Sequence, residues 1–304
     1  MTVLRLGTRK SLMATTQSQL VADALSERTG HAVELVGVTT EGDVSKALLA
    51  QIGGTGVFVN ALRDKLLAGE VDFAVHSLKD LPTGPAEGIV LAATPRRDDP
   101  RDALCGPAKL ADLPTGARIG TGSPRRVAQL RALRPDLNVV PIRGNADTRL
   151  RKVTDGELDA VVLAYAGLRR IDRLEAVAEI FEPDQMLPAP GQGSLALECR
   201  ADRAELRELL GTVDDRATRA AVTAERTVLA VLEAGCSAPV GAYAAEVEQK
   251  LHLTASVVAH DGSRQIRLSA SGRLDDAEEL GRDLAARLLG QGADQLMGER
   301  LEPQ

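Results

Sequence analysis

Short apolar runs alternate with helical patterns along the first two hundred residues, and such alternation is typical of α/β layers. Ser11 stands where a side-chain oxygen can cap a helix, and Gly30 stands where a helix can stop. The glycine-rich stretch 53–56 predicts a flexible loop. The pattern predicts strands over 2–6, 32–38 and 71–75 and helices over 11–29 and 57–67.

The pattern restarts after the Pro/Arg/Asp-rich stretch 94–101, where we predict a hinge between two domains. In the second domain Pro124 follows Ser123 as the first residue of a helix, and Asn145 is the expected cap of another. The stretch 183–193 contains three prolines and two glycines and predicts a second crossing between the domains. Strands are predicted over 118–120, 139–142 and 160–163.

The pattern changes again beyond residue 215. A long helix over 217–232 precedes alternating runs at 251–258 and 265–271 and a further helix over 276–289. Alternating runs that follow each other closely are typical of antiparallel strands. We therefore predict a small α+β domain at this end of the chain.

The charge of the chain is unevenly distributed. The 304 residues carry a formal net charge of −6, yet residues 118–152 carry nine basic and two acidic side chains. An acidic chain with one basic block predicts a focused anion site rather than a polyanion-binding surface. The alternative is a set of solvated helix faces. With no Trp, two Tyr and three Phe, the chain offers few rings on which nucleobases could stack, so we expect no nucleic acid partner.

Other partners and compartments are constrained by what the sequence contains. The longest apolar candidate, 160–168, is half the length that a membrane span needs, so we expect no membrane association. The first residues read as a strand start and not as a basic-then-apolar leader, which predicts a cytoplasmic protein. Cys105, Cys199 and Cys236 lie far apart, and no two of them have the spacing of a zinc or redox motif, so no metal is expected.

The basic block contains arginines placed for anion binding. Arg125 and Arg126 fall in the first turn of a predicted helix, where their charges oppose the helix dipole unless an anion offsets them. Arg143 and Arg149 follow the next predicted strand. The carboxyl ends of parallel strands are where open α/β sheets bind ligands. A planar guanidinium group can bind either a carboxylate or a phosphate through two parallel hydrogen bonds, so the residues alone leave the identity of the anion open.

Two further segments hold candidate chemistry. Asp80 follows a buried strand beside Lys79, and it is either half of an ion pair on a turn or a carboxylate that stabilises a developing cation or moves a proton. His76 has no nucleophile near it in sequence and is predicted to be structural. Cys236 lies in a Gly-Cys-Ser-Ala-Pro loop, where a reactive or modified thiol competes with an ordinary buried cysteine.

The order of these and other motifs resembles the porphobilinogen deaminase (hydroxymethylbilane synthase) family from residue 4 to about residue 243. The motifs, in order along the chain, are Leu-Gly-Thr-Arg-Lys-Ser (6–11), Gly-Asp (42–43), His-Ser-Leu-Lys-Asp (76–80), Pro-Arg-Asp-Ala (100–103), Thr-Gly-Ser-Pro-Arg-Arg (121–126), Arg-Gly-Asn (143–145), Thr-Arg-Leu (148–150), Ala-Gly-Leu (166–168), Gly-Gln-Gly (191–193), Thr-Ala-Glu-Arg (223–226) and Glu-Ala-Gly-Cys (233–236).

The resemblance implies an activity and a fold. The family condenses four porphobilinogen molecules head to tail, releases ammonia each time, and produces the linear tetrapyrrole hydroxymethylbilane. Its dipyrromethane cofactor is held by a thioether to a loop cysteine, which matches Cys236. The implied fold has two similar α/β lobes, like those of type II periplasmic binding proteins, around a cleft, and a small α+β domain. The expected domains are 1–96 with 194–213, 99–188, and 216–304.

The resemblance also implies roles for single residues. Asp80 matches the catalytic aspartate, which binds pyrrole N–H groups and stabilises the cationic azafulvene formed when ammonia leaves. The arginines match positions that bind the acetate and propionate groups of the pyrrole rings. The implied cofactor-binding residues are Lys79, Asp80, Ser123, Arg125, Arg126, Gly144, Asn145 and Cys236, and the implied substrate-binding residues are Arg9, Ser11, Phe58, Arg126, Arg143, Arg149, Arg170 and Gln192. A monomer that passes its product to uroporphyrinogen-III synthase is expected.

Several positions depart from the family pattern. Glu41 stands where many members have a basic residue or threonine, and Gln51 and Thr55 stand at lid-loop positions that are often lysine. Gly122 and Pro124 replace a more usual Ser and Leu. The missing lysines reduce the positive charge of the lid and leave its role in retaining substrate open.

Three competing interpretations follow from the same residues. A non-enzymatic anion receptor also has two α/β lobes around a hinge, but it would not need Cys236 on a third domain. A cysteine-dependent transferase or hydrolase would need His252 or His260 to approach Cys236 through folding. A nucleic-acid binder conflicts with the net charge and the scarcity of aromatic residues.

Overall fold

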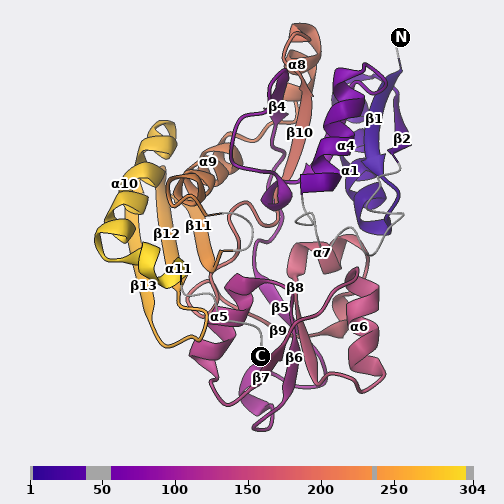
Figure 1. Cartoon of the computed structure of the whole chain (residues 1–304). Coiled ribbons are helices and arrows are strands. Elements are labelled where there is room, and N and C mark those ends of the chain that lie inside the picture. The colour runs from indigo at the N-terminus through magenta and orange to yellow at the C-terminus, as the bar shows by residue number, and fades with distance from the viewer. Residues whose placement is uncertain (1–2, 39–55, 235–237, 299–304) are drawn as a thin grey trace. The chain divides into compact units, whose positions relative to one another are not determined.

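Three β-sheets form the framework of the described chain (Figure 1). The computed structural model describes residues 3–38, 56–234 and 238–298, and the side chains of residues 56–58 lie outside this description. The contacts divide the chain into two units. The first unit comprises residues 1–98 and 194–219, and the second comprises residues 99–193 and 220–304.

The first unit is built on a sheet with the strand order β2-β1-β3-β10-β4. Strands β1, β2 and β3 are parallel, whereas β10 runs antiparallel to both of its neighbours. Both faces of the sheet are covered, because Phe73 of β3 packs in one apolar cluster with α1 and Ala74 packs in another with α4. The elements are β1 (Leu4–Arg9), α1 (Leu12–Thr29), β2 (Val33–Val38), α4 (Gly56–Leu67), β3 (Phe73–Ser77), β4 (Ile89–Ala93), β10 (Leu195–Arg200) and α8 (Ala204–Gly211).

Helix α1 begins and ends as predicted. The Ser11 hydroxyl accepts a hydrogen bond from the backbone N–H of Ala14 at 3.3 Å, and Gly30 adopts a left-handed conformation with φ of 71°. Strand β3 differs from the prediction, because it begins at Phe73 and continues to Ser77. His76 and Ser77 therefore belong to the strand, and the turn that carries Asp80 starts after them.

The second unit contains a sheet of the same design, with the order β7-β6-β8-β5-β9. Strands β6, β7 and β8 are parallel, and β5 is antiparallel to both β8 and β9. Strand β7 stops at Val140, two residues before the predicted end, and the next residue is Pro141, which has no N–H for the ladder. The elements are β5 (Asp102–Cys105), β6 (Arg118–Gly120), α5 (Pro124–Leu133), β7 (Asn138–Val140), α6 (Ala146–Thr154), β8 (Ala160–Ala164), α7 (Tyr165–Arg170) and β9 (Val177–Ile180).

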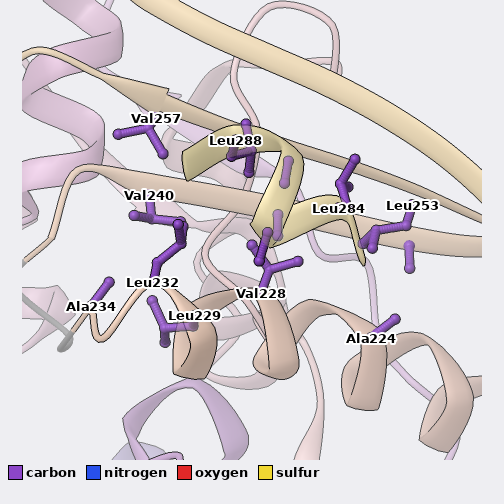
Figure 2. Packing of buried hydrophobic residues seen from close by; sticks show 14 of the residues in the cluster. Ala224, Val228, Leu229, Leu232, Ala234, Val240, Leu253, Val257, Leu284 and Leu288 are labelled. Atoms are coloured by element: carbon purple, nitrogen blue, oxygen red, sulfur yellow. The ribbon is translucent and has the colours of Figure 1, made fainter. Parts of the chain in front are cut away.

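An antiparallel sheet with the order β11-β12-β13 and its helices complete the second unit. Figure 2 shows its core, in which Val228 of α9 and Leu232 just after that helix pack with Leu284 and Leu288 of α10 and with strand residues such as Val257. The elements are α9 (Arg216–Val231), β11 (Val240–Val247), β12 (Lys250–Val258), β13 (Gln265–Gly272), α10 (Ala277–Gly290) and α11 (Ala293–Gly298). Short 3₁₀ helices span Leu78–Asp80, Leu110–Asp112, Leu174–Ala176 and Leu274–Asp276.

The two larger sheets share a detail of connectivity. In each sheet, three parallel strands lie next to one antiparallel strand. That antiparallel strand is the first strand in the sequence after the chain enters the unit from the other unit. These strands are β5 in the second unit and β10 in the first. The predicted fold class is therefore confirmed: two similar α/β lobes accompany a small α+β domain. The exact limits of three separate domains stay a prediction.

Candidate active site

Asp80 lies where a parallel strand of the first unit ends. Strand β3 stops at Ser77, and residues 78–80 form a single 3₁₀ turn. Leu78 anchors this turn, because its side chain is fully buried and its N–H donates to the carbonyl of Ser194 at 3.0 Å. The Asp80 side chain is exposed beyond this anchor, and Lys79 beside it is half-buried. The turn thus presents a carboxylate to the surface from a fixed backbone.

Arg9 and Ser11 lie at the same edge of the sheet. Arg9 is the last residue of β1, which pairs in parallel with β3, and Ser11 caps the helix that follows. The carboxyl ends of two adjacent parallel strands therefore bring a guanidinium group, a hydroxyl group and the Asp80 carboxylate to one edge. This is the placement that the sequence predicted for a ligand site.

His76 belongs to a buried polar network behind this edge. Its Nε2 lies 3.3 Å from Oε2 of Glu198, and Arg63 of α4 donates to the same carboxylate at 3.0 and 2.7 Å. Burial alone would raise the pKa of Glu198, but contact with His76 and Arg63 lowers it to about 2. Because His76 is buried against Glu198, the structure agrees with a structural role.

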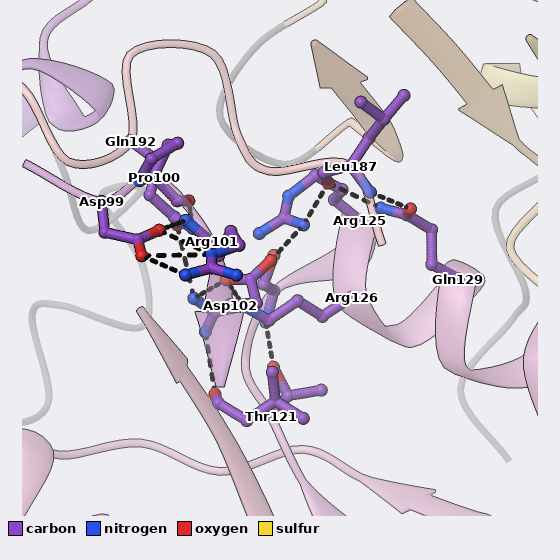
Figure 3. Close-up of polar contacts among 12 residues, drawn as sticks. Asp99, Pro100, Arg101, Asp102, Thr121, Arg125, Arg126, Gln129, Leu187 and Gln192 are labelled. Carbon is purple, nitrogen blue, oxygen red and sulfur yellow. Dashed lines mark hydrogen bonds and ion pairs between the residues drawn. The ribbon is translucent and has the colours of Figure 1, made fainter. Parts of the chain in front are cut away.

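Arg125 and Arg126 of the second unit are buried around an internal carboxylate (Figure 3). Nη1 of Arg125 lies 2.7 Å from Oδ2 of Asp102, and Nη2 of Arg126 lies 2.7 Å from Oδ1. The two arginines also donate to the carbonyls of Leu187 and Val162 at 2.6 and 2.9 Å. The sequence predicted an anion at these arginines, and Asp102 is one such anion from within the chain.

Gln192 joins the same cluster from the second predicted crossing. Its amide Nε2 donates to Oδ1 of Asp102 at 2.8 Å and to the carbonyl of Pro100 at 2.7 Å. Its side chain is buried. Segments that are ninety residues apart in sequence therefore meet at one carboxylate.

The electrostatics of this cluster favour a further anion. Burial alone would raise the pKa of Asp102, but the charges of Arg125 and Arg126 and hydrogen bonds from Arg125 and Gln192 hold it well below its usual range. Two guanidinium groups thus share one ionised carboxylate. Burial and the charge of Arg126 also lower the pKa of Arg149. This part of the second unit therefore carries partly desolvated positive charge.

Most of the remaining residues predicted for the second unit lie at or near the start of α6. The Asn145 side chain accepts the N–H of Thr148 at 2.8 Å, and Nε of Arg149 donates to the carbonyl of Gly144 at 2.8 Å. Gly144 has φ of 109°, and a Cβ atom there would lie 2.8 Å from Thr148, so a glycine is required. Arg143 is exposed in the same segment. Arg170 ends α7 and donates to the carbonyl of Gly193 at 2.7 Å.

Ser123 is only partly what the sequence predicted. It stands at the N-cap position of α5, but its side chain makes no capping hydrogen bond. Its N–H instead donates to the Thr121 hydroxyl at 3.2 Å. A Cβ atom at Gly122 would lie 2.7 Å from the carbonyl of Ile142, so the close approach of these two loops requires a glycine here.

Some predicted residues cannot be compared with the structure. Cys236, Glu41, Gln51 and Thr55 lie outside the described residues, as does the side chain of Phe58. Among the described residues, no helix is long and apolar enough to cross a membrane, and no cluster of metal-binding side chains occurs. No role was predicted from the sequence for Asp102 or Glu198, which pair with residues that were singled out. An acidic residue inside a short apolar strand was the available signal for both.

Solved structures that align with part of this chain include the following two. The VFT2 domain of Bordetella pertussis BvgS aligns with a TM-score of 0.42 and 18% identity over 69% of this chain and 86% of that chain. A periplasmic substrate-binding protein of an ABC transporter from Coxiella burnetii aligns with a TM-score of 0.43 and 14% identity over 69% of this chain and 91% of that chain.

Sequence comparisons are much closer. The porphobilinogen deaminase of Thermobifida fusca is 62% identical over 98% of this chain and 97% of its own length, and porphobilinogen deaminase 1 of Streptomyces coelicolor is 56% identical over 98% of each. The family description "Porphobilinogen deaminase, dipyromethane cofactor binding domain" matches residues 4–208, and "Porphobilinogen deaminase, C-terminal domain" matches residues 219–290. With identity this high over nearly the whole chain, the protein belongs to the porphobilinogen deaminase family.

Proposed function

We infer that this chain is a hydroxymethylbilane synthase, a transferase that joins four porphobilinogen molecules head to tail and releases one ammonia at each step. Membership in the family over nearly the full length carries this inference. The geometry supports it, since an exposed carboxylate on an anchored turn and a set of arginines with excess positive charge are the groups that such a reaction needs.

The chain's residues suit a cofactor that bears carboxylates. Around Asp102 two buried guanidinium groups meet one internal carboxylate, so one positive charge is left for a ligand. The acetate and propionate groups of a pyrrole chain match that charge and the bidentate geometry of arginine. We propose that Cys236 holds a dipyrromethane by a thioether. When bound, this group supplies the end of the growing chain.

We propose that Asp80 acts on the reacting ring. Its carboxylate would accept hydrogen bonds from pyrrole N–H groups and stabilise the positive charge that develops as ammonia leaves. It would then accept the proton released when the carbon–carbon bond has formed. Exposure of its side chain leaves it accessible to a substrate.

The other predicted residues would bind the substituents of the rings. Basic side chains supply most of these contacts, and polar groups at helix starts supplement them. The proposed set comprises Arg9, Ser11, Phe58, Lys79, Ser123, Arg125, Arg126, Arg143, Gly144, Asn145, Arg149, Arg170 and Gln192. We further propose three domains (1–96 with 194–213, 99–188, and 216–304), a monomeric state, a cytoplasmic location and transfer of the product to uroporphyrinogen-III synthase.

The mass of the intact denatured protein tests this function. The wild type is expected to exceed its polypeptide mass by two linked pyrrole units, and Cys236→Ser is expected to have the bare mass. The wild type should also consume porphobilinogen and release ammonia. A protein that lacks the added mass and leaves porphobilinogen unchanged would exclude the enzyme and would favour a simple anion receptor.

A further inference from the structure

The carboxylate of Asp102 is the point at which three segments of the second unit meet. It lies on β5, whose first residue it is, and its side chain is fully buried. The guanidinium groups of Arg125 and Arg126 approach it from α5, and the amide of Gln192 approaches it from the second predicted crossing, 183–193 (Figure 3). Because no substrate atom could reach a fully buried carboxylate directly, Asp102 is not a catalytic residue.

Asp102 fixes the orientation of Arg126. Oδ1 of Asp102 accepts from Nε of Arg126 at 3.0 Å and from Nη2 at 2.7 Å, so two donors of one guanidinium group converge on a single oxygen and fix the orientation of the group. Nη1 donates to the carbonyl of Val162 at 2.9 Å, and Nη2 makes a longer contact of 3.4 Å with Gln192. Among the described residues these contacts use four of the five N–H groups. The remaining donor, on Nη1, therefore has a direction set by the protein.

The Asp102 carboxylate has two opposite effects on the binding of an anion by Arg126. The Asp102 carboxylate cancels one of two positive charges and so weakens the long-range attraction for an anion. It also holds Arg126 in one rotamer, and a preorganised donor binds its ligand without first losing side-chain entropy. The two effects can be separated by experiment, because they predict opposite outcomes when the carboxylate is removed.

We propose that Asp102 is a positioning residue that holds Arg126 ready to bind a carboxylate substituent of a pyrrole chain. The proposal rests on the proposed function for the identity of the ligand, and it adds a residue that never touches that ligand. Gln192 supports the arrangement, since the same amide bonds Asp102 and the carbonyl of Pro100. Loss of the carboxylate is expected to weaken ligand binding even though it makes the site more positive.

The first test replaces the charge and keeps the shape. For Asp102→Asn, we expect apoprotein incubated with porphobilinogen to gain the cofactor mass about tenfold more slowly than wild type, by intact-mass measurement. In the fraction that carries the cofactor, KM for porphobilinogen should rise about tenfold, the effect of one lost charged hydrogen bond, while kcat changes little. Asp136→Asn is the matched control, because Asp136 pairs with Arg134 at 2.7 Å just beyond the same helix.

The second test opposes charge to orientation directly. In Arg125→Gln alone, Arg126 is still held by Asp102, and the two side chains together have no net charge. In Arg125→Gln combined with Asp102→Asn, one net positive charge is restored but Arg126 has lost its carboxylate partner. Positioning predicts that the double variant gains the cofactor mass more slowly and has the higher KM. Faster loading or tighter binding by the double variant would show that charge dominates and would overturn the proposal.

The outcomes also separate this proposal from the proposed function. If the wild type shows no added mass and no turnover, the function itself is wrong. If the wild type is active and Asp102→Asn loses only thermal stability, with cofactor loading and KM equal to those of Asp136→Asn, then Asp102 is merely structural. If Asp102→Asn alone does not fold because two buried guanidinium groups lose their shared carboxylate, the double variant, which removes one of those guanidinium groups and keeps the net charge of the wild-type cluster, is compared with Arg125→Gln to decide the question.

Discussion

Acidic residues of this protein occupy contrasting surroundings, and those surroundings determine what each can do. Asp80 is exposed at the end of a short turn, whereas Asp102 is buried against two arginines and Glu198 is buried against an arginine and a histidine. A buried carboxylate that is paired with cations stays ionised and holds its partners in place. An exposed one remains free to meet a substrate. The proposed chemistry at Asp80 and the positioning by Asp102 are therefore distinct uses of the same functional group.

Replacement of Asp80 by Asn is expected to lower kcat by about 100-fold or more, which is the usual contribution of a proton-transferring group. Stability should change by less than about 0.5 kcal/mol because the side chain is exposed. Steady-state assays together with intact mass would show an inactive protein that keeps its cofactor. Asp112→Asn is the matched control, since Asp112 is the exposed last residue of another 3₁₀ turn. Turnover within twofold of the wild type in Asp80→Asn would refute the catalytic role.

Replacement of Glu198 by Gln is expected to destabilise the protein in a pH-dependent way. The pKa of Glu198 is lowered from 4.5 to about 2 in the folded state, which corresponds to roughly 3 kcal/mol of stability. A lowered folded pKa means that this stability is fully present above pH 5 and is lost as pH falls toward 2. Urea unfolding of both proteins across this range should show a difference that shrinks with acid. A difference independent of pH would contradict this origin.

The sequence predicted the types of these residues better than their partners. Asp80 follows a predicted strand and Ser11 begins a predicted helix, so local pattern was enough to single them out, whereas Arg9 was named only through the family resemblance. Asp102 pairs with Gln192, ninety residues away, so its role depends on a long-range contact that no local pattern encodes. The arginines were expected to face a ligand alone, because the sequence does not reveal which carboxylate folds against them.

Elements were predicted well where local signals mark their ends. Ser11 and Asn145 act as helix caps, and both were identified from sequence. Strand β11 was missed because its Ala and Gly residues have little strand preference, and pairing with β12 makes it a strand. Strand β10 was given no bounds, although Cys199 lies in a strand-like run, because Glu198 interrupts the apolar pattern and the partners of that charge lie on α4 and β3.

The packing of α10 on α9 provides a test at this scale. A Cβ atom at Gly281 would lie 2.5 Å from the carbonyl of Ala224, whereas one at Gly290 would meet nothing within 4 Å. Gly281→Ala should therefore lower the free energy of unfolding by about 1–3 kcal/mol, the usual cost of overpacking. Gly290→Ala in the same helix should be neutral or stabilise by up to about 1 kcal/mol. Equal stability of the two variants in denaturant titrations would mean that the helices pack less closely.

At the scale of the molecule, the first unit is discontinuous in sequence. Its sheet needs β10 between β3 and β4, and β10 comes after the whole of residues 99–193. The two ends of that insertion lie together, because Gln192 bonds the carbonyl of Pro100 at 2.7 Å. Crossings over 94–101 and 183–193 were predicted from proline, glycine and charge, whereas the return of β10 to the first sheet depends on the pairing of strands that are far apart in sequence.

A shortened protein would test this discontinuity. Residues 1–98 joined to residues 194–219 by a short Gly/Ser linker should fold, since all five strands of the first sheet are then present. Residues 1–98 alone should not fold, because β4 pairs only with β10 among the described strands. Circular dichroism and protease resistance would distinguish the two. A stably folded 1–98 fragment would contradict the requirement for β10.

The late arrival of β10 also has a consequence for the newly made chain. During synthesis β5 to β9 all leave the ribosome before residue 195, so the five-stranded sheet of the second unit has all of its strands first. Strands β3 and β4 both pair with β10, so the sheet of the first unit lacks this strand until β10 has been made. We therefore expect the sheet of the second unit to form before that of the first, and we expect the unpaired edges of β3 and β4 to be exposed to aggregation until β10 is made.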